Sequence, residues 1–206
     1  MISGMSFDEI KNHLAGYTVG IAGAGGLGSN CAAALVRTGI MHLVIADFDI
    51  VDSSNLNRQF FFADQAGMKK TEALRDNLIR IDPAVRLDIH DIRLDRDNIA
   101  VIFRDCDIIV EAFDRSDMKE MLTETVSDLW PERPLILGSG IAGYGNTNKL
   151  RERFIDDTLI VCGDEESEIS ESLPPLAPRV GIVAHMQANA VVDILMKRKR
   201  DENNIE

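Results

Sequence analysis

Four glycines near the amino end of the sequence could hold phosphate. Gly23, Gly25 and Gly28 form a G-x-G-x-x-G pattern in IAGAGGLGSN, directly after an apolar run, and Gly26 lies within the same turn. Such a turn lets backbone N–H groups at the start of a helix approach phosphate oxygens. The pattern predicts a nucleotide site, but it does not distinguish a dinucleotide used for hydride transfer from ATP.

Polar and basic side chains follow the second apolar run. Asp47 ends that run, where a Rossmann domain places the acid that binds a ribose hydroxyl. The string DFDIVDSSNLNRQ then brings Asn55, Arg58 and Gln59, and Lys70 follows eleven residues later. Two cations beside a phosphate turn exceed what NAD needs. They suit a nucleoside triphosphate whose charge must be neutralised during attack.

One further carboxylate completes this set. Asp114 directly follows the apolar run CDIIVEAF, so it is expected at the carboxyl edge of a sheet, where ligands bind in open α/β folds. A carboxylate there suits Mg²⁺ held between protein and phosphates. The sequence contains no G-x-x-x-x-G-K-[ST], so the nucleotide site is not a P-loop.

These residues need a scaffold in which strands and helices alternate. The patterning predicts a Rossmann-like α/β fold, a doubly wound and mostly parallel sheet. A capping box at Ser6–Glu9 predicts a short first helix. The expected strands are 18–23, 42–47, 85–90, 106–113 and 134–139, and the expected helices are 26–39, 69–82, 95–104 and 116–129.

The character of the sequence changes after residue 140. Residues 140–163 are rich in turn residues with short strand-like pieces, and the acidic run 164–172 is expected to be a solvated, mobile loop. A last helix is predicted over 178–200, followed by a frayed tail. We expect one domain over residues 1–206, with a nucleotide-binding core at 16–145 and, at 146–206, a short irregular or antiparallel extension that includes the last helix.

Composition excludes several classes of protein. The formal net charge of −12 over 206 residues argues against a protein that mainly binds nucleic-acid backbone. No apolar run is long enough to span a bilayer and no signal peptide is recognisable, so a cytoplasmic location is expected. The three cysteines form no C-x-x-C, so no zinc site is expected.

Several strings resemble a known family. GAGGLGS, DFDIVDSSNLNRQ, GMKK and EAFD resemble the ThiF, MoeB and HesA family of ubiquitin-activating-enzyme-like adenylyltransferases, over about residues 16–145. The string SNLNRQ is the most specific part. The ending LAPRVGIVAHMQAN further resembles a short ThiF-type branch of the family from thiamine biosynthesis.

The resemblance implies an enzyme that uses ATP and Mg²⁺ to adenylate the Gly-Gly carboxylate of a ThiS-like sulfur carrier protein, and it implies a homodimer. The glycine turn would hold the nucleotide and Asp47 the ribose. Asn55, Arg58 and Lys70 would hold the phosphates, Asp114 would bind Mg²⁺, and Gln59 would position the loop. The extension after residue 146 would face the carrier.

The chain also departs from the family pattern. The two zinc-binding C-x-x-C pairs of MoeB-like members are missing, as is the arginine that their amino-terminal segment gives to the partner's site. The first arginine here is Arg37, so that role is either absent, taken by a residue such as Lys11, or supplied by another chain. Cys162 is the candidate for a persulfide or thioester step, although free cysteines are usually structural.

Three alternatives stay open. A tRNA threonylcarbamoyladenosine dehydratase would use the same ATP chemistry, but the net acidity counts against it. An NAD(P) oxidoreductase would explain the glycine turn and Asp47. A non-catalytic module that binds ATP and a carrier would explain the missing arginine.

Overall fold

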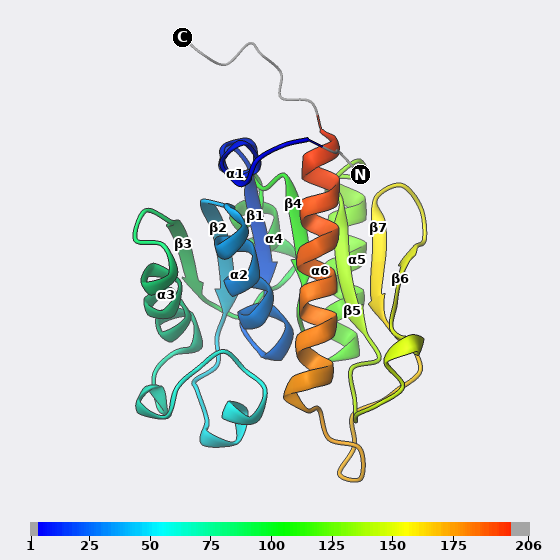
Figure 1. Ribbon diagram of the computed structural model, residues 1–206. Coiled ribbons are helices and arrows are strands. Elements are labelled where there is room, and N and C mark those ends of the chain that lie inside the picture. Colours follow the sequence, from blue (N-terminus) through cyan, green and yellow to red (C-terminus); the bar gives the residue numbers. More distant parts are fainter. Residues whose placement is uncertain (1–3, 199–206) are drawn as a thin grey trace.

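A single seven-stranded sheet forms the centre of the molecule (Figure 1). The structure, a computed structural model, describes residues 4–198. The strands lie in the order β3-β2-β1-β4-β5-β7-β6, and all neighbours are parallel except β6, which runs antiparallel to β7 at the sheet edge. The strands are β1 (Thr18–Ala22), β2 (His42–Asp47), β3 (Arg86–Asp91), β4 (Ile108–Glu111), β5 (Leu135–Ser139), β6 (Arg151–Phe154) and β7 (Leu159–Gly163).

Helices cover both faces of the sheet. On one face α2 packs beside α3 and α6, and α1 joins them at the top of Figure 1, while α4 and α5 pack together on the other face. The helices are α1 (Phe7–Leu14), α2 (Gly26–Thr38), α3 (Lys70–Ile81), α4 (Arg96–Ile102), α5 (Ser116–Leu129) and α6 (Ala177–Lys197). The expected doubly wound α/β fold is confirmed.

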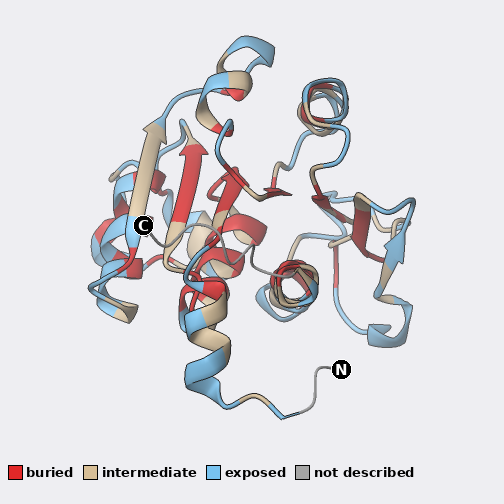
Figure 2. Cartoon of the chain, turned by 90° about the horizontal axis from the view of Figure 1, so that it is seen from above, coloured by how far each residue is buried: buried red, intermediate tan, exposed pale blue. Residues whose placement is uncertain are grey.

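Each helical layer closes its own hydrophobic core. Ile21, Ile45 and Val110 point into the core under α2 and α6, whereas Ala22, Val44 and Ile109 belong to the core under α4 and α5. Neighbouring strand residues thus face opposite layers, as the two-residue period of a strand requires. Figure 2 shows this arrangement from above, with buried residues on the central strands and on the helix sides that face them.

Local signals in the sequence account for several helix ends. Ser6 and Glu9 form the predicted capping box at α1, and α2 ends at Gly39, whose φ of 113° is the left-handed geometry that glycine adopts without strain. The predicted end of the last helix at residue 200 and the predicted frayed tail fall partly or wholly outside the described residues. No described helix combines the length and the apolar character needed to cross a bilayer.

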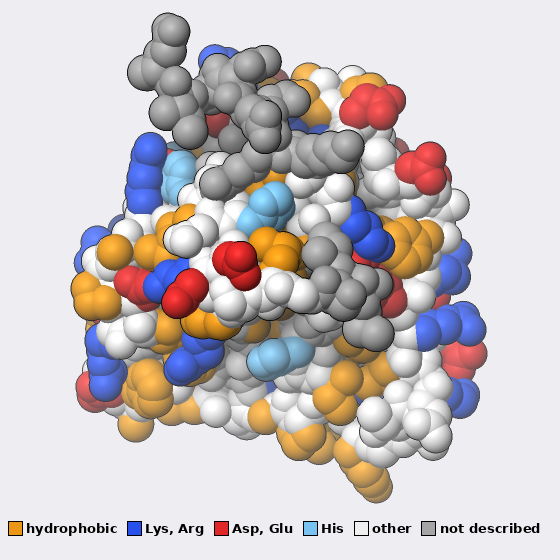
Figure 3. Space-filling view, turned by 45° about the horizontal axis from the view of Figure 1, so that its top comes forward, with side chains coloured by type: hydrophobic (Ala, Val, Ile, Leu, Met, Phe, Trp, Pro, Cys, Tyr) orange, Lys and Arg blue, Asp and Glu red, His pale blue; other side chains and the backbone are white. Residues whose placement is uncertain are grey.

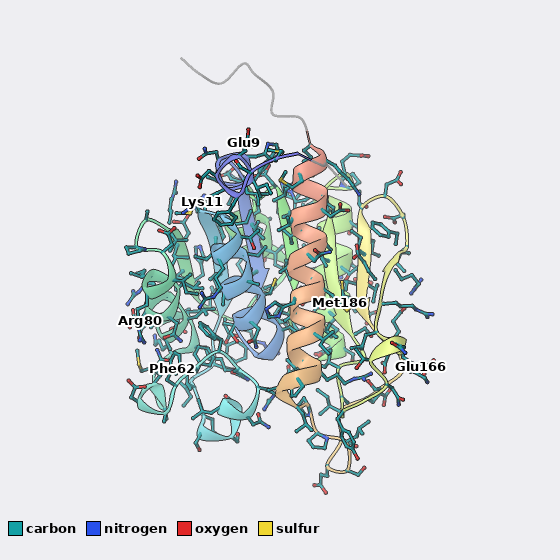
Figure 4. The ribbon with its side chains drawn as sticks, in the orientation of Figure 1. Glu9, Lys11, Phe62, Arg80, Glu166 and Met186 are labelled. Atoms are coloured by element: carbon teal, nitrogen blue, oxygen red, sulfur yellow. The ribbon has the colours of Figure 1, made fainter. Side chains whose placement is uncertain are left out.

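Two connecting segments have regular structure, and the second confirms the expected antiparallel extension. The long polar segment after β2 contains two 3₁₀ turns, Ser53–Asn57 and Ala63–Gln65. The guanidinium of Arg80 lies 5.7 Å from the ring centroid of Phe62, which ties this segment to α3 (Figure 4). The residues after 146 form the β6–β7 hairpin, and β7 pairs with β5, so the extension completes the same sheet.

Candidate functional site

A pocket of about 540 Å³ opens where β1, β2 and β4 end, at the bottom of Figure 1. This is the carboxyl edge of the parallel sheet, the place where open α/β folds bind ligands. Seven of the residues singled out in the sequence line the pocket: Gly25, Gly26, Asp47, Arg58, Gln59, Lys70 and Asp114. The fold therefore brings together side chains that are up to ninety residues apart in the sequence.

The glycine turn leaves no room for side chains at Gly23 and Gly28. Gly23 has φ +105° and lies against the backbone of Ala112, and a Cβ on Gly28 would collide with the carbonyl oxygen of Gly23. Gly26 fits between Val180 of α6 and the side chain of Arg58. Gly23 and Gly28 thus shape the turn from behind, while Gly25 and Gly26 face the pocket.

The first turn of α2 also fixes the segment that carries Arg58. The Asn30 amide donates to the backbone oxygens of Gly26 and Arg58, at 2.7 and 2.9 Å. The Ser29 hydroxyl accepts from the Phe60 N–H at 2.9 Å. Sequence reasoning missed these two positioning residues, although both directly follow the glycines in GLGSN.

Asp47 accepts hydrogen bonds from the backbone of the site. Its carboxylate accepts hydrogen bonds from the N–H groups of Ala24, at 2.6 Å, and Asp49, at 2.8 Å. Burial raises the pKa of Asp47, and the Ala24 hydrogen bond and the charge of Lys70 oppose that rise. The carboxylate therefore braces the glycine turn from the end of β2 and also lines the pocket.

The two predicted cations are both anchored in the pocket. The Lys70 ammonium is nearly buried and donates to Asp49 at 2.7 Å, while half of the Asp49 side chain stays exposed. The Arg58 guanidinium donates to the Asn57 side chain at 2.7 Å and to the Ser54 oxygen at 3.3 Å. These partners hold each cation in the pocket and leave donors for an anion.

Gln59 and Asn55 have different positions. Gln59 is buried against the pocket, and its Oε1 has no hydrogen-bond partner in the described part of the chain. Asn55 does not line the pocket. Its side chain accepts from the Asp52 N–H and caps the 3₁₀ turn, and its neighbours Ser54 and Asn57 line the pocket instead. Phosphate binding by Asn55 stays a prediction.

Asp114 lies at the pocket mouth on a turn that a buried ion pair holds in place. Among residues 4–198, no hydrogen bond engages its carboxylate. Three residues earlier, Glu111 is fully buried and accepts from Lys119 with both carboxylate oxygens, at 2.8 and 2.9 Å. Glu111 also accepts from the Phe113 N–H at 2.6 Å, which fixes the turn that leads to Asp114.

The Glu111–Lys119 pair joins three elements of the fold. Lys119 donates to Glu111 and to the Gly138 oxygen and so joins α5 to β4 and β5. Burial raises the pKa of Glu111, and the charge of Lys119 opposes that rise. The signal in the sequence was a single charged residue, Glu111, inside the otherwise apolar run IIVEAF.

Cys162 is buried in the sheet. It belongs to the turn-rich segment with short strand-like pieces, and it lies on one of these strands, β7, with no exposed surface. Burial raises the pKa of its thiol to about 12, which disfavours the thiolate that a persulfide or thioester step needs. A role for Cys162 in such a step stays a prediction. The residue is part of the core in this structure and lies outside the pocket.

Lys11 does not reach the pocket of its own chain. It pairs with Asp82 at 3.0 Å and packs against Gly39, so it lies at the amino end of the sheet, opposite the pocket (Figure 4). Figure 3 tips the amino end of the sheet toward the viewer, and acidic and basic side chains are interspersed on the face it shows.

The acidic run after β7 is more fixed than expected at its start. Asp164 is buried and pairs with Arg179 in the first turn of α6, and it also accepts from the N–H groups of Glu166 and Ser167. Arg179 donates in addition to the Gly145 oxygen at 2.7 Å. This pair joins the two loops whose apolar residues close one wall of the pocket, namely Ile141, Ile169, Pro174 and Pro175.

Four helices begin at the pocket, and all four lack a side-chain cap. These are α2, α3, α5 and α6, whereas α1 and α4 each have a capping box. A helix start carries unpaired N–H groups and partial positive charge. Lys70 is the first residue of α3, and Arg115 occupies the N-cap position of α5 without capping it. Basic residues at such starts oppose the helix dipole, and an anion bound in the pocket would relieve this opposition.

Comparison with known proteins agrees with this geometry. The sequence matches the ThiF family over residues 3–206. The chain belongs to the ThiF family. Ubiquitin-like modifier-activating enzyme 5 of Caenorhabditis elegans is 43% identical over 77 residues, which are 37% of this chain and 18% of that protein. The probable adenylyltransferase/sulfurtransferase MoeZ of Mycobacterium tuberculosis is 31% identical over 120 residues, 58% of this chain and 30% of MoeZ.

Solved structures share the fold. The E. coli tRNA N6-threonylcarbamoyladenosine dehydratase TcdA in complex with ATP superposes with a TM-score of 0.83 and 19% identity, over 92% of this chain and 89% of that one. E. coli MccB with ATP gives a TM-score of 0.71 and 21% identity, over 91% of this chain and 58% of that one. The matched regions cover less than a third of the two curated relatives, so the likeness supports the family and the fold rather than a particular substrate.

Proposed function

We propose that this protein adenylates the C-terminal Gly-Gly carboxylate of a ubiquitin-fold sulfur carrier, a ThiS-like protein of thiamine thiazole biosynthesis. The observation that carries this proposal is the convergence of four uncapped helix starts on one pocket that also contains Arg58 and Lys70. Such a pocket suits a triphosphate better than the two phosphates of NAD.

In the proposed reaction a carrier carboxylate oxygen attacks the α-phosphorus of ATP. The bond from that phosphorus to the α–β bridging oxygen breaks, and pyrophosphate leaves with the electron pair. The carboxylate is already ionised, so the protein needs no general base. Its residues align the reactants and neutralise charge: the glycine turn holds the nucleotide, Asp47 the ribose, and Arg58 and Lys70 the phosphates.

The site fits Mg²⁺ that arrives with the nucleotide. In the described part of the chain no cluster of three acidic, histidine or cysteine side chains could hold a metal alone. Mg²⁺ in nucleotide enzymes is usually held by one or two carboxylates plus substrate phosphates, and Asp114 offers one such carboxylate at the pocket mouth. Mg²⁺ would shield the negative charge of the phosphates. Gln59, whose Oε1 is unpaired, would accept a hydrogen bond from the bound nucleotide or a water.

ATP–pyrophosphate exchange tests the proposal. Purified protein with Mg²⁺ is expected to exchange labelled pyrophosphate into ATP when a carrier ending in Gly-Gly is added. A carrier that lacks its last glycine is the matched control and should give background exchange. Binding of ATP without exchange under any of these conditions would instead support a carrier-binding module that has no chemistry.

The same preparation separates the remaining alternatives. ATP should raise the melting temperature and NADH should not; by mass action, a ligand at a hundred times its Kd stabilises by about 2.7 kcal/mol. A larger shift with NADH would favour an oxidoreductase. Salt-sensitive binding of tRNA would favour the dehydratase, although the net charge of −12 opposes it. Sedimentation of the pure protein would test the homodimer.

A further inference from the structure

Arg115 is a third cation in the pocket, and the sequence analysis assigned it no role. It follows Asp114, lines the pocket and occupies the N-cap position of α5. N-caps favour Ser, Thr, Asp or Asn, because their side chains accept from the unpaired N–H groups. An arginine has no acceptor, and its charge opposes the helix dipole. This position therefore costs stability unless an anion is present.

The structure holds Arg115 with an exposed acid. Its guanidinium donates to Asp117 through two hydrogen bonds, of 3.0 and 2.6 Å, and both side chains are about 60% exposed. Surface ion pairs of this kind are weak, since water screens both charges. A phosphate chain with several charges can therefore replace Asp117 as the partner of Arg115.

Lys70, which also lines the pocket, is likewise paired with a partly exposed acid. It begins α3, and its partner Asp49 is half exposed. Arg179 of α6 differs, because both it and Asp164 are buried and its guanidinium is already shared with the Gly145 oxygen. The pocket thus has two cations with exchangeable acidic partners, Lys70 and Arg115, and one fixed ion pair in its wall.

We propose that Arg115 leaves Asp117 to bind the β- and γ-phosphates of ATP, and that it neutralises the leaving pyrophosphate within the same chain. This inference rests on the proposed function. Arg115 adjoins Asp114, so one turn would supply both a cation and a metal-binding carboxylate to the same end of the nucleotide. With Arg115 in place, the pocket needs no arginine from a second chain.

Arg96→Ala is the matched control for Arg115→Ala. Arg96 also lies in the first turn of a helix, is about half exposed and pairs with an acid, Glu124, but it does not line the pocket. Arg115→Ala should weaken ATP binding about tenfold or more and leave AMP binding unchanged, because AMP lacks the β- and γ-phosphates. Its exchange rate at saturating ATP should fall about a hundredfold. Arg96→Ala should match the wild type in all three measurements.

Asp117→Asn tests the exchange of partners. Removing the competing carboxylate should tighten ATP binding two- to fivefold, and this gain should vanish in the Arg115→Ala/Asp117→Asn double variant. Equal losses for ATP and AMP in Arg115→Ala, or an Arg115→Ala variant that behaves like Arg96→Ala, would overturn the role of Arg115.

Mixing two variants tests whether Arg115 acts within its own chain. Arg115→Ala mixed with Lys70→Ala should stay inactive, whereas recovered exchange would mean that Arg115 serves a partner's site. A wild-type protein that binds ATP but never exchanges pyrophosphate would remove the proposed function. The ATP and AMP affinities would then still decide whether Arg115 contacts the phosphates.

Discussion

At the residue scale, the Glu111–Lys119 pair decides where the turn before Asp114 lies. Glu111 is fully buried, and a buried charge needs partners. Lys119 and the N–H groups of Phe113 and Gly138 supply them. Removing one partner of a buried pair leaves an uncompensated charge, which typically costs about 3–5 kcal/mol. This pair therefore links the stability of β4 and α5 to the geometry of the pocket mouth.

Lys119→Met should lower the free energy of unfolding by about 3 kcal/mol at pH 7. Burial raises the pKa of Glu111, and loss of Lys119 would raise it further. A carboxyl whose pKa is raised on folding costs stability above its unfolded pKa, and this cost disappears as the pH falls. The destabilisation should therefore shrink between pH 7 and pH 4 in urea unfolding. Lys119→Met/Glu111→Gln should recover most of the loss at pH 7, and no recovery would contradict this account.

The sequence predicted residues well where a motif is local. The glycine turn, Asp47, Arg58 and Lys70 were all found from short strings, and they meet at one pocket. It missed Glu111 and Lys119, because their contact joins a strand to a helix eight residues later and depends on tertiary packing. The burial of Cys162 was not predictable from local sequence, because it depends on the pairing of β7 with β5, which joins distant parts of the chain.

At the element scale, the close approach of α2 to the end of β1 depends on glycine. Gly28→Ala should disrupt the turn, because a Cβ there would collide with the Gly23 oxygen, a rigid backbone atom. We expect a loss of about 2 kcal/mol in stability and a loss of ATP binding. Gly181 of α6 is the matched control, since it is also helical and its Cβ would meet no atom within 4 Å.

Gly181→Ala should raise stability by about 0.5–1 kcal/mol, because alanine favours a helix over glycine. Thermal unfolding with and without ATP measures both variants. If Gly28→Ala kept wild-type stability and ATP affinity, the proposed fit of the glycine turn would be wrong. Comparing the two variants separates the cost of the steric clash at residue 28 from the general effect of replacing a helical glycine with alanine.

Element boundaries were predicted within a few residues where capping or a left-handed glycine marks them, as at Ser6 and Gly39. The segment between β2 and α3 was harder to predict. Its 3₁₀ turns are fixed by contacts with α2 and α3, such as the hydrogen bond from Asn77 to the Phe60 oxygen. Those contacts join distant parts of the sequence, and no local pattern specifies them.

At the scale of the whole molecule, the carboxyl groups set the response to acid. In the described residues, more carboxyls have a lowered pKa than a raised one. Hydrogen bonds and ion pairs lower the pKa of Glu9, Asp52, Asp82, Asp88, Asp117, Asp156, Asp164 and Glu165. Burial raises the pKa of Asp47, Glu111 and Glu152.

A carboxyl with a lowered pKa binds its proton more tightly in the unfolded chain. The stability it contributes is present above its unfolded pKa, about 4, and is lost as the pH falls through its folded pKa. The three carboxyls with a raised pKa act in the opposite direction, because the stability they cost at neutral pH is regained as the pH falls. Because the lowered groups outnumber them, the melting temperature should fall steeply below about pH 4.5. A melting temperature that stays constant down to pH 3, at fixed ionic strength, would show that the buried carboxyls with raised pKa balance the rest.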